Sequence, residues 1–180
     1  MRLSTLARRY AGALFEIARQ SDVIDQVESD LGMIGYSLQT MPKLVETLRH
    51  PLIPPVRKKA IVAEIFRDHV QDVTLRFVEL VIDKRREEIL PDVEPEYVRL
   101  ANDYRGILPV AITSAVPLTK DEMRLLKGRL DELTGKNTDL ELSEDPDLIG
   151  GLTICIGDTV IDGSVRGYLA VLREQMLGNG

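Results

Sequence analysis

The chain has 180 residues, of which 44% are hydrophobic and 29% are charged, and this composition excludes wholesale disorder. Its formal net charge of −6 means that a nucleic-acid-binding protein of this kind would need one dense basic face. The single cysteine, Cys155, excludes a disulfide within these residues, and no apolar stretch approaches the about 20 residues that span a bilayer.

Residues 1–105 carry apolar side chains at helical spacing and predict a bundle of six short helices. Ser4 is a suitable N-cap for the first helix, and a second helix follows Ser21. Pro42 opens a short third helix, and a proline-rich loop precedes the fourth. The fifth begins near Asp72, and Gly106 is suited to end the sixth.

The fourth helix contains both apolar and basic residues. Its expected buried face consists of Val56, Ala60, Ala63 and Phe66, with Ile61 and Ile65 beside them. The same helix contains the basic triplet 57–59, and a second basic triplet occupies residues 84–86. These triplets are the best candidates for a nucleic-acid contact, but both are short, and Glu87 and Glu88 neutralise the second.

The first and fifth helices are apolar on more than one face, whereas a surface helix needs only one apolar stripe. Two interpretations follow. Either these helices are central in the bundle, or a groove between them accepts an amphipathic helix from another protein. The small residues Ala7, Ala11 and Gly12 suit a close approach between helices.

After Gly106 the apolar period changes, which predicts a small α/β domain over residues 106–180 and an α+β class for the whole chain. A strand is expected over 108–116 and another over 138–143. Thr119 and Glu122 form a capping box that opens the helix between them, and Gly135 ends it. The apolar face of this helix is expected to contain Met123, Leu126, Leu130 and Leu133.

The glycine-rich segment 157–169, GDTVIDGSVRGYL, suggests a phosphate loop or a catalytic site at first sight. A P-loop needs a lysine, and none follows Gly150. Asp158, Asp162 and Ser164 lie close together, but no histidine accompanies them as a general base. The sequence therefore predicts no catalytic residue in this segment, and it offers no ligand set for a metal.

A structural interpretation explains the segment better. Gly157 and Asp158 suit a two-residue hairpin turn between strands 152–156 and 159–161. Either Asp162 or Ser164 then caps the last helix, and Gly163 relaxes the turn before it. The apolar stripe of that helix contains Val165, Leu169, Leu172 and Met176.

Residues 150–169 resemble the C-terminal signature of the ATP synthase delta subunit family, whose mitochondrial counterpart is the oligomycin-sensitivity-conferring protein. Residues 7–15, ARRYAGALF, and residues 90–93, LPDV, are also similar to that family, as is Pro51 with the following Lys58 and Phe66. The match covers the whole chain. Gly12 and Tyr168 depart from it, because long polar side chains are expected there.

The resemblance implies a non-catalytic stator subunit without a cofactor or metal, and without a nucleic-acid partner. Its helical domain would bind the N-terminal helix of an alpha subunit on the catalytic head, through Tyr10, Ala13, Leu14, Phe77 and Val81. Its C-terminal domain would hold the C-terminal end of the peripheral stalk, with candidate contacts at Ile161, Val165, Arg166, Leu169 and Leu172. The chain would lie on the cytoplasmic face of a bacterial inner membrane and reach that membrane only through the complex.

Overall fold

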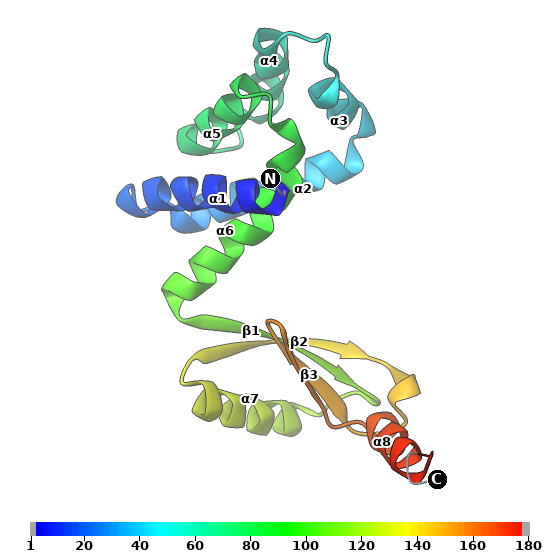
Figure 1. The fold of residues 1–180 in the computed structure, drawn as a ribbon. Coiled ribbons are helices and arrows are strands. Elements are labelled where there is room, and N and C mark those ends of the chain that lie inside the picture. The colour runs from blue at the N-terminus through cyan, green and yellow to red at the C-terminus, as the bar shows by residue number, and fades with distance from the viewer. Residues whose placement is uncertain (1–2, 178–180) are drawn as a thin grey trace. The chain divides into compact units, whose positions relative to one another are not determined.

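The computed structural model describes residues 3–177 and divides the chain into two compact units, Met1–Ala101 and Asn102–Gly180 (Figure 1). The division falls inside the last turn of the helix Leu90–Arg105. The change in apolar period had placed the junction after residue 105, at the end of that helix. The two units are described separately below.

The helices of the first unit are α1 (Leu3–Gln20), α2 (Ile24–Thr40), α3 (Pro42–Arg49), α4 (Pro55–Phe66), α5 (Asp72–Asp83) and α6 (Leu90–Arg105), with a 3-10 turn, η1 (Glu87–Ile89), before α6. Proline occupies the first position of α3 and α4 because its missing N–H has no intrahelical partner there. Gly106 follows α6 with a φ of 68°, as expected for a C′ residue. The N-cap prediction for Ser4 was wrong, because Ser4 lies inside α1.

One apolar cluster fills the first unit. Ala7 and Ala11 are fully buried, so α1 approaches its neighbours closely along this side. Gly12 does not share this role: a Cβ atom built there would meet nothing within 4 Å. The glycine that is packed closely is Gly35 in α2, where the Glu94 carboxylate occupies the place of a side chain.

The buried face of α4 differs from the predicted one. Of the four predicted residues only Phe66 is buried, and Val56 is 74% exposed. The other buried residues of α4 are Lys58 and Val62, and Ile61 and Ile65 pack against the core partly buried. Lys58 Nζ lies 2.7 Å from Glu87 Oε1 and also donates to the Leu48 carbonyl. Only 7% of the Lys58 side chain and 8% of the Glu87 side chain are exposed. A buried lysine is tolerated here because its charge is paired and hydrogen-bonded.

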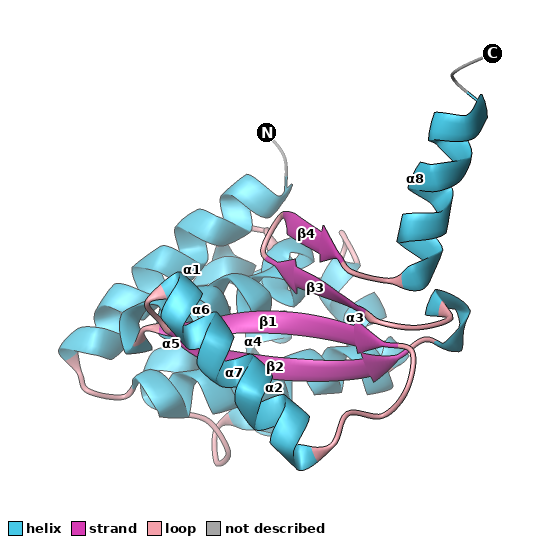
Figure 2. Ribbon diagram, turned by 90° about the horizontal axis from the view of Figure 1, so that it is seen from below, coloured by secondary structure: helices cyan, strands magenta, loops and turns pink. Residues whose placement is uncertain are grey.

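The second unit is a four-stranded sheet with two helices. Its elements are β1 (Ile107–Ser114), α7 (Lys120–Thr134), β2 (Asn137–Glu144), the 3-10 turn η2 (Pro146–Leu148), β3 (Leu152–Ile156), β4 (Thr159–Asp162) and α8 (Val165–Leu177). The strand order is β2-β1-β3-β4, in which β1 and β2 are parallel and the other neighbours are antiparallel. Helix α7 lies across one face of the sheet, and α8 projects away from it (Figure 2).

Helix α7 is delimited as the sequence predicts. The Thr119 hydroxyl accepts the Glu122 N–H at 3.3 Å, and the Glu122 carboxylate accepts the Thr119 N–H at 2.8 Å. Gly135 ends the helix with a φ of 66°. Leu130 is buried against the sheet, but Leu133 is 83% exposed. The observed apolar face is therefore one residue shorter than the predicted face.

The Asp131 carboxylate joins the end of α7 to the start of β2. Its Oδ1 accepts hydrogen bonds of 2.6 Å from both the N–H and the hydroxyl of Thr138, and the Lys127 ammonium lies 3.2 Å from Oδ2. The hydrogen bond from the Thr138 side chain, and then that from its backbone, lower the pKa of Asp131 below the ordinary value of 3.8. Its ionised form is therefore favoured by folding.

This lowered pKa predicts the sign of a pH effect. A carboxyl with a lower pKa in the folded state stabilises the fold above its unfolded pKa, and this contribution is lost as pH falls through the folded pKa. We therefore expect the second unit to lose stability below about pH 4, and Asp131→Asn to lose less stability over the same pH range. Urea denaturation at several pH values measures this, and an equally steep acid slope in the variant would contradict it.

Candidate functional site

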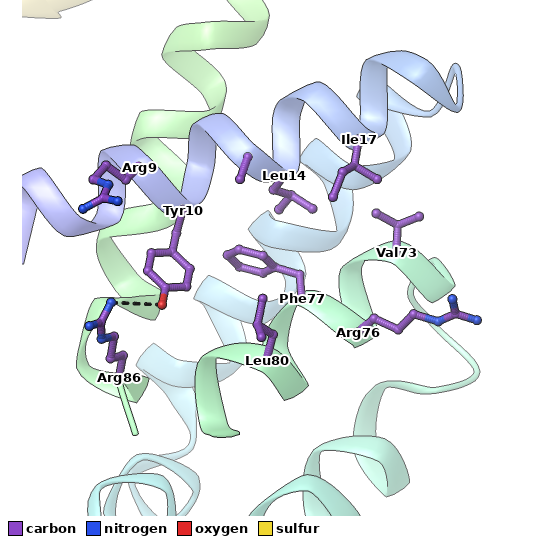
Figure 3. Close-up of a pocket in the computed structure, with 10 residues that line it drawn as sticks. Arg9, Tyr10, Leu14, Ile17, Val73, Arg76, Phe77, Leu80 and Arg86 are labelled. Atoms are coloured by element: carbon purple, nitrogen blue, oxygen red, sulfur yellow. Dashed lines mark hydrogen bonds between the residues drawn. The ribbon is translucent and has the colours of Figure 1, made fainter. Parts of the chain in front are cut away.

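An apolar groove runs between α1 and α5, with a volume of about 540 Å³ (Figure 3). Helix α1 contributes one wall and α5 the other, with Arg86 beyond the end of α5. The apolar lining consists of Tyr10, Ala13, Leu14, Ile17, Val73, Phe77 and Leu80. Three arginines, Arg9, Arg76 and Arg86, complete the lining. The second apolar faces of these two helices therefore border a groove.

Four of the five side chains proposed for this surface from the sequence line the groove: Tyr10, Ala13, Leu14 and Phe77. Val81 does not, because it is fully buried in the core. Two further lining residues were not among those proposed: Ile17 and Leu80, which are 50% and 47% exposed. Ile17 lies three residues after Leu14 and Leu80 three residues after Phe77, on the same helix face in each case.

Aromatic contacts hold the two walls together at one end of the groove. The rings of Tyr10 and Phe77 meet edge to face, with their centroids 6.3 Å apart. Arg86 donates a hydrogen bond of 3.0 Å to the Tyr10 hydroxyl, and its guanidinium carbon lies 5.7 Å from the centre of the Tyr10 ring. Tyr10 is thereby fixed by α1, α5 and the segment after α5.

A buried carboxylate positions the start of α5. Asp30, on α2, accepts a 2.8 Å hydrogen bond from the Gln71 N–H and a 2.7 Å hydrogen bond from the Thr74 hydroxyl. Asp30 is only 6% exposed, and Thr74 is fully buried. A negative charge at a helix N-terminus also complements the helix dipole. Asp30 therefore anchors one groove wall to the helix behind it.

The glycine-rich segment in the second unit folds as a hairpin and a capped helix. Gly157 and Asp158 form the turn between β3 and β4, and Gly157 has a φ of 57°. Of the two proposed caps, Ser164 performs the role: its hydroxyl accepts the Gly167 N–H at 3.0 Å. Asp162 instead accepts the Ser164 N–H at 2.8 Å, and hydrogen bonding with Ser164 lowers the pKa of Asp162.

The glycines around this turn make room for their neighbours. Gly151 has a φ of 76°, and the Gly163 carbonyl stands where a Cβ atom would lie. At Gly167 the Asp162 carboxylate fills the space that a Cβ atom would need. The Asp162 carboxylate and the Ser164 hydroxyl are thus engaged in holding the strand-to-helix turn. Cys155 on β3 is half-buried, and its thiol contacts the Gly157 carbonyl.

The five side chains proposed for the stalk contact lie on β4 and α8 at the surface of the second unit. The four apolar side chains among them are all exposed to solvent: Ile161, Val165, Leu169 and Leu172. The last three belong to the apolar stripe of α8. Arg166 lies 3.9 Å from Asp145 and keeps most of its side chain exposed. The described residues of the second unit therefore leave the apolar stripe of α8 exposed.

The described part of the chain, residues 3–177, contains no helix long and apolar enough to cross a membrane. Within the same range, no three His, Cys, Asp or Glu side chains gather as a metal site would require.

Comparison with known proteins identifies the family. The family model described as "ATP synthase delta (OSCP) subunit" matches residues 6–176. The ATP synthase subunit delta of Heliobacterium modesticaldum is 42% identical over 182 residues, covering 98% of this chain and 96% of that protein. That of Salinibacter ruber is 41% identical over 172 residues, covering 96% and 90%.

Solved structures show the same fold. A chain in the Toxoplasma gondii mitochondrial ATP synthase hexamer superposes with a TM-score of 0.67 at 19% identity, and the match covers 96% of this chain and 97% of that one. The family match and the identities extend over nearly the full length, so they apply to both units. The chain therefore belongs to the ATP synthase delta (OSCP) subunit family, whose members are non-catalytic stator components of the ATP synthase.

Proposed function

We propose that the chain ties the catalytic head to the peripheral stalk through two separate surfaces, so that rotor torque does not turn the head. In this proposal the first unit acts as a six-helix bundle, and its groove binds the N-terminal helix of an alpha subunit. The second unit holds the C-terminal end of the stalk, and one copy of the chain serves the complex.

The groove between α1 and α5 carries this proposal. A static joint needs buried apolar area and slow dissociation. The groove offers an aromatic floor, made by Tyr10 and Phe77, between two accessible aliphatic side chains, Ile17 and Leu80. An amphipathic helix fits a groove of this kind by placing residues at every third or fourth position on its floor.

The uncovered stripe of α8 supports the second contact. Leu169 and Leu172 would expose their apolar surface to water in the free chain, although the helix is properly capped by Ser164. Exposed apolar groups that follow one helix face mark a surface used for association. We propose that a helix of the stalk covers this stripe together with Ile161 of β4.

The proposal also gives the chain a location. The relatives described above are bacterial ATP synthase delta subunits. We therefore place the chain on the cytoplasmic face of a bacterial inner membrane, where it is held by the other subunits of the complex.

Calorimetric titration of the full chain with a synthetic peptide of the alpha-subunit N-terminus, from the same ATP synthase, tests the groove contact. We expect one peptide per chain, with a dissociation constant in the submicromolar range, about −8 kcal/mol or stronger. A scrambled peptide of equal composition serves as the control. Failure to bind both the peptide and a catalytic head stripped of this subunit would refute the proposal.

A further inference from the structure

The charged residues that line the groove are all positively charged. Arg9, Arg76 and Arg86 line the groove, and no carboxylate does. This is unexpected in a chain whose formal net charge is −6. The three arginines are exposed, so the groove is an apolar strip with a positively charged border.

The arginines are unevenly placed and unevenly paired. Figure 3 shows Arg9 and Arg86 at the Tyr10 end of the groove, and Arg76 beside Val73 at the other end. Arg76 lies 3.8 Å from the Asp72 carboxylate. Across residues 3–177, by contrast, no carboxylate lies within the 4.0 Å pairing distance of Arg9 or Arg86. The Tyr10 end is therefore the part of the groove with uncompensated positive charge.

Arg86 is also held in position before any partner arrives. Its Nη1 donates to the Tyr10 hydroxyl at 3.0 Å, and Tyr10 is packed against Phe77. A guanidinium has five N–H donors, so Arg86 retains donors that can face an incoming group. A prepositioned guanidinium loses less side-chain entropy when it binds a carboxylate than a freely moving one.

A helix bound in the groove would exclude water from this end and strengthen the field of the two arginines. A neutral partner would then cover two cations without compensating them. A carboxylate would form charge-assisted hydrogen bonds with them, and its negative charge would also speed association. Such an arrangement would discriminate between an acidic and a neutral helix of equal apolar character.

We infer that the groove selects an acidic amphipathic helix, in which a Glu or Asp next to the apolar stripe binds between Arg9 and Arg86. The inference rests on the proposed function for the source of this helix, the alpha-subunit N-terminus, and adds the chemistry that the groove requires of it. Arg9 and Arg86 are thus specificity-determining residues for the head contact.

Titrations with the same alpha-subunit peptide test this inference in the full chain. We compare Arg9→Gln and Arg86→Gln with Arg124→Gln, a matched control that removes an exposed arginine on α7. At about 50 mM salt we expect Arg9→Gln and Arg86→Gln to bind about threefold to tenfold more weakly than the wild type, largely through slower association. At about 500 mM salt the difference should shrink, because screening weakens the arginine contribution. Arg124→Gln should bind as the wild type does.

A second peptide, in which every Glu and Asp is changed to Gln and Asn, completes a double-mutant cycle between the peptide carboxylates and the arginines. We expect this neutral peptide to bind the wild type as weakly as the acidic peptide binds Arg9→Gln, and to lose little further affinity for that variant. Arg86→Lys, which retains the charge, should recover part of the association rate lost in Arg86→Gln.

The outcomes separate the inference from the proposed function. If the acidic peptide does not bind the wild type at all, the proposed function fails. If both peptides bind the wild type equally, or if Arg9→Gln binds the acidic peptide like the wild type at low salt, the inference is overturned while the proposed function stands. An Arg86→Gln loss that is equal at both salt concentrations also overturns the inference, because it reflects the packing of Tyr10.

Discussion

The full chain carrying Leu80→Asp should bind the alpha-subunit peptide at least about 30-fold more weakly than the wild type, a loss of about 2 kcal/mol or more. Leu80 is 47% exposed in the groove, so the new carboxylate remains hydrated in the free chain. When a helix covers the groove, that carboxylate loses its water, and the apolar contact of the leucine is missing. The stability of the variant should change by no more than about 0.5 kcal/mol.

Calorimetry measures the affinity of this variant, and urea denaturation measures its stability. Leu52→Asp is the matched control, because Leu52 is 84% exposed and lies outside the groove. Phe77→Asp would be a poor test: Phe77 is only 7% exposed, so a carboxylate there would destabilise the fold itself. Equal peptide affinity for Leu80→Asp and Leu52→Asp would show that the groove is not the binding surface.

The second large effect concerns stability. Lys58→Met should destabilise the first unit by about 3–5 kcal/mol, because it leaves the buried Glu87 carboxylate without its cation. Lys58 also donates to the Leu48 carbonyl, so the variant loses a link among α3, α4 and η1. The double variant Lys58→Met/Glu87→Leu should recover most of the loss, since both buried charges are then absent.

Lys59→Met provides the control in the neighbouring position. Lys59 pairs with Asp83 at 2.8 Å, but 29% of its side chain and 45% of that of Asp83 are exposed. An exposed pair contributes at most about 1 kcal/mol. Urea denaturation of the full chains, followed by the helical signal, measures the difference. Similar midpoints for Lys58→Met and Lys59→Met would contradict the structural role of the buried pair.

The ends of several elements could be predicted because single residues determine them. Pro42 and Gly106 have backbone preferences that few neighbours can override, and Thr119 with Glu122 forms its capping box locally. The groove could be predicted in outline for a similar reason: two helices carried more apolar surface than one buried face requires. Its exact lining depended on tertiary packing, which turned Val81 inward and left Leu80 outside.

The largest error arose in α4, where Lys58 was considered only as part of a basic triplet that could contact nucleic acid. Its partner Glu87 lies 29 residues away in sequence, so the residues around Lys58 do not indicate that the lysine is buried. For the same reason the role of Asp30 could not be predicted, because the residue that it binds at the start of α5 lies 41 positions away in sequence. The pairing of Lys58 with Glu87, and of Lys59 with Asp83, also shows that these two lysines of the triplet link α4 to η1 and α5.

In helix α8 the apolar stripe could be predicted, but its exposure could not. Its apolar stripe has the spacing of a core helix, yet Leu169 and Leu172 remain accessible. Periodicity indicates that a face is meant to be covered, but it does not say whether the cover comes from the same chain. The proposed stalk contact supplies that cover from another subunit.

Assembly of three components tests the central proposal most directly: the chain, a catalytic head stripped of this subunit, and a soluble fragment of the stalk, analysed together by sedimentation. We expect head and stalk fragment to sediment as one complex only when the chain is present. Leu80→Asp should retain the stalk fragment and lose the head, whereas Leu169→Asp should retain the head and lose the stalk fragment. Assembly that neither substitution affects, or that each abolishes on both sides, would contradict a joint made of two separate surfaces.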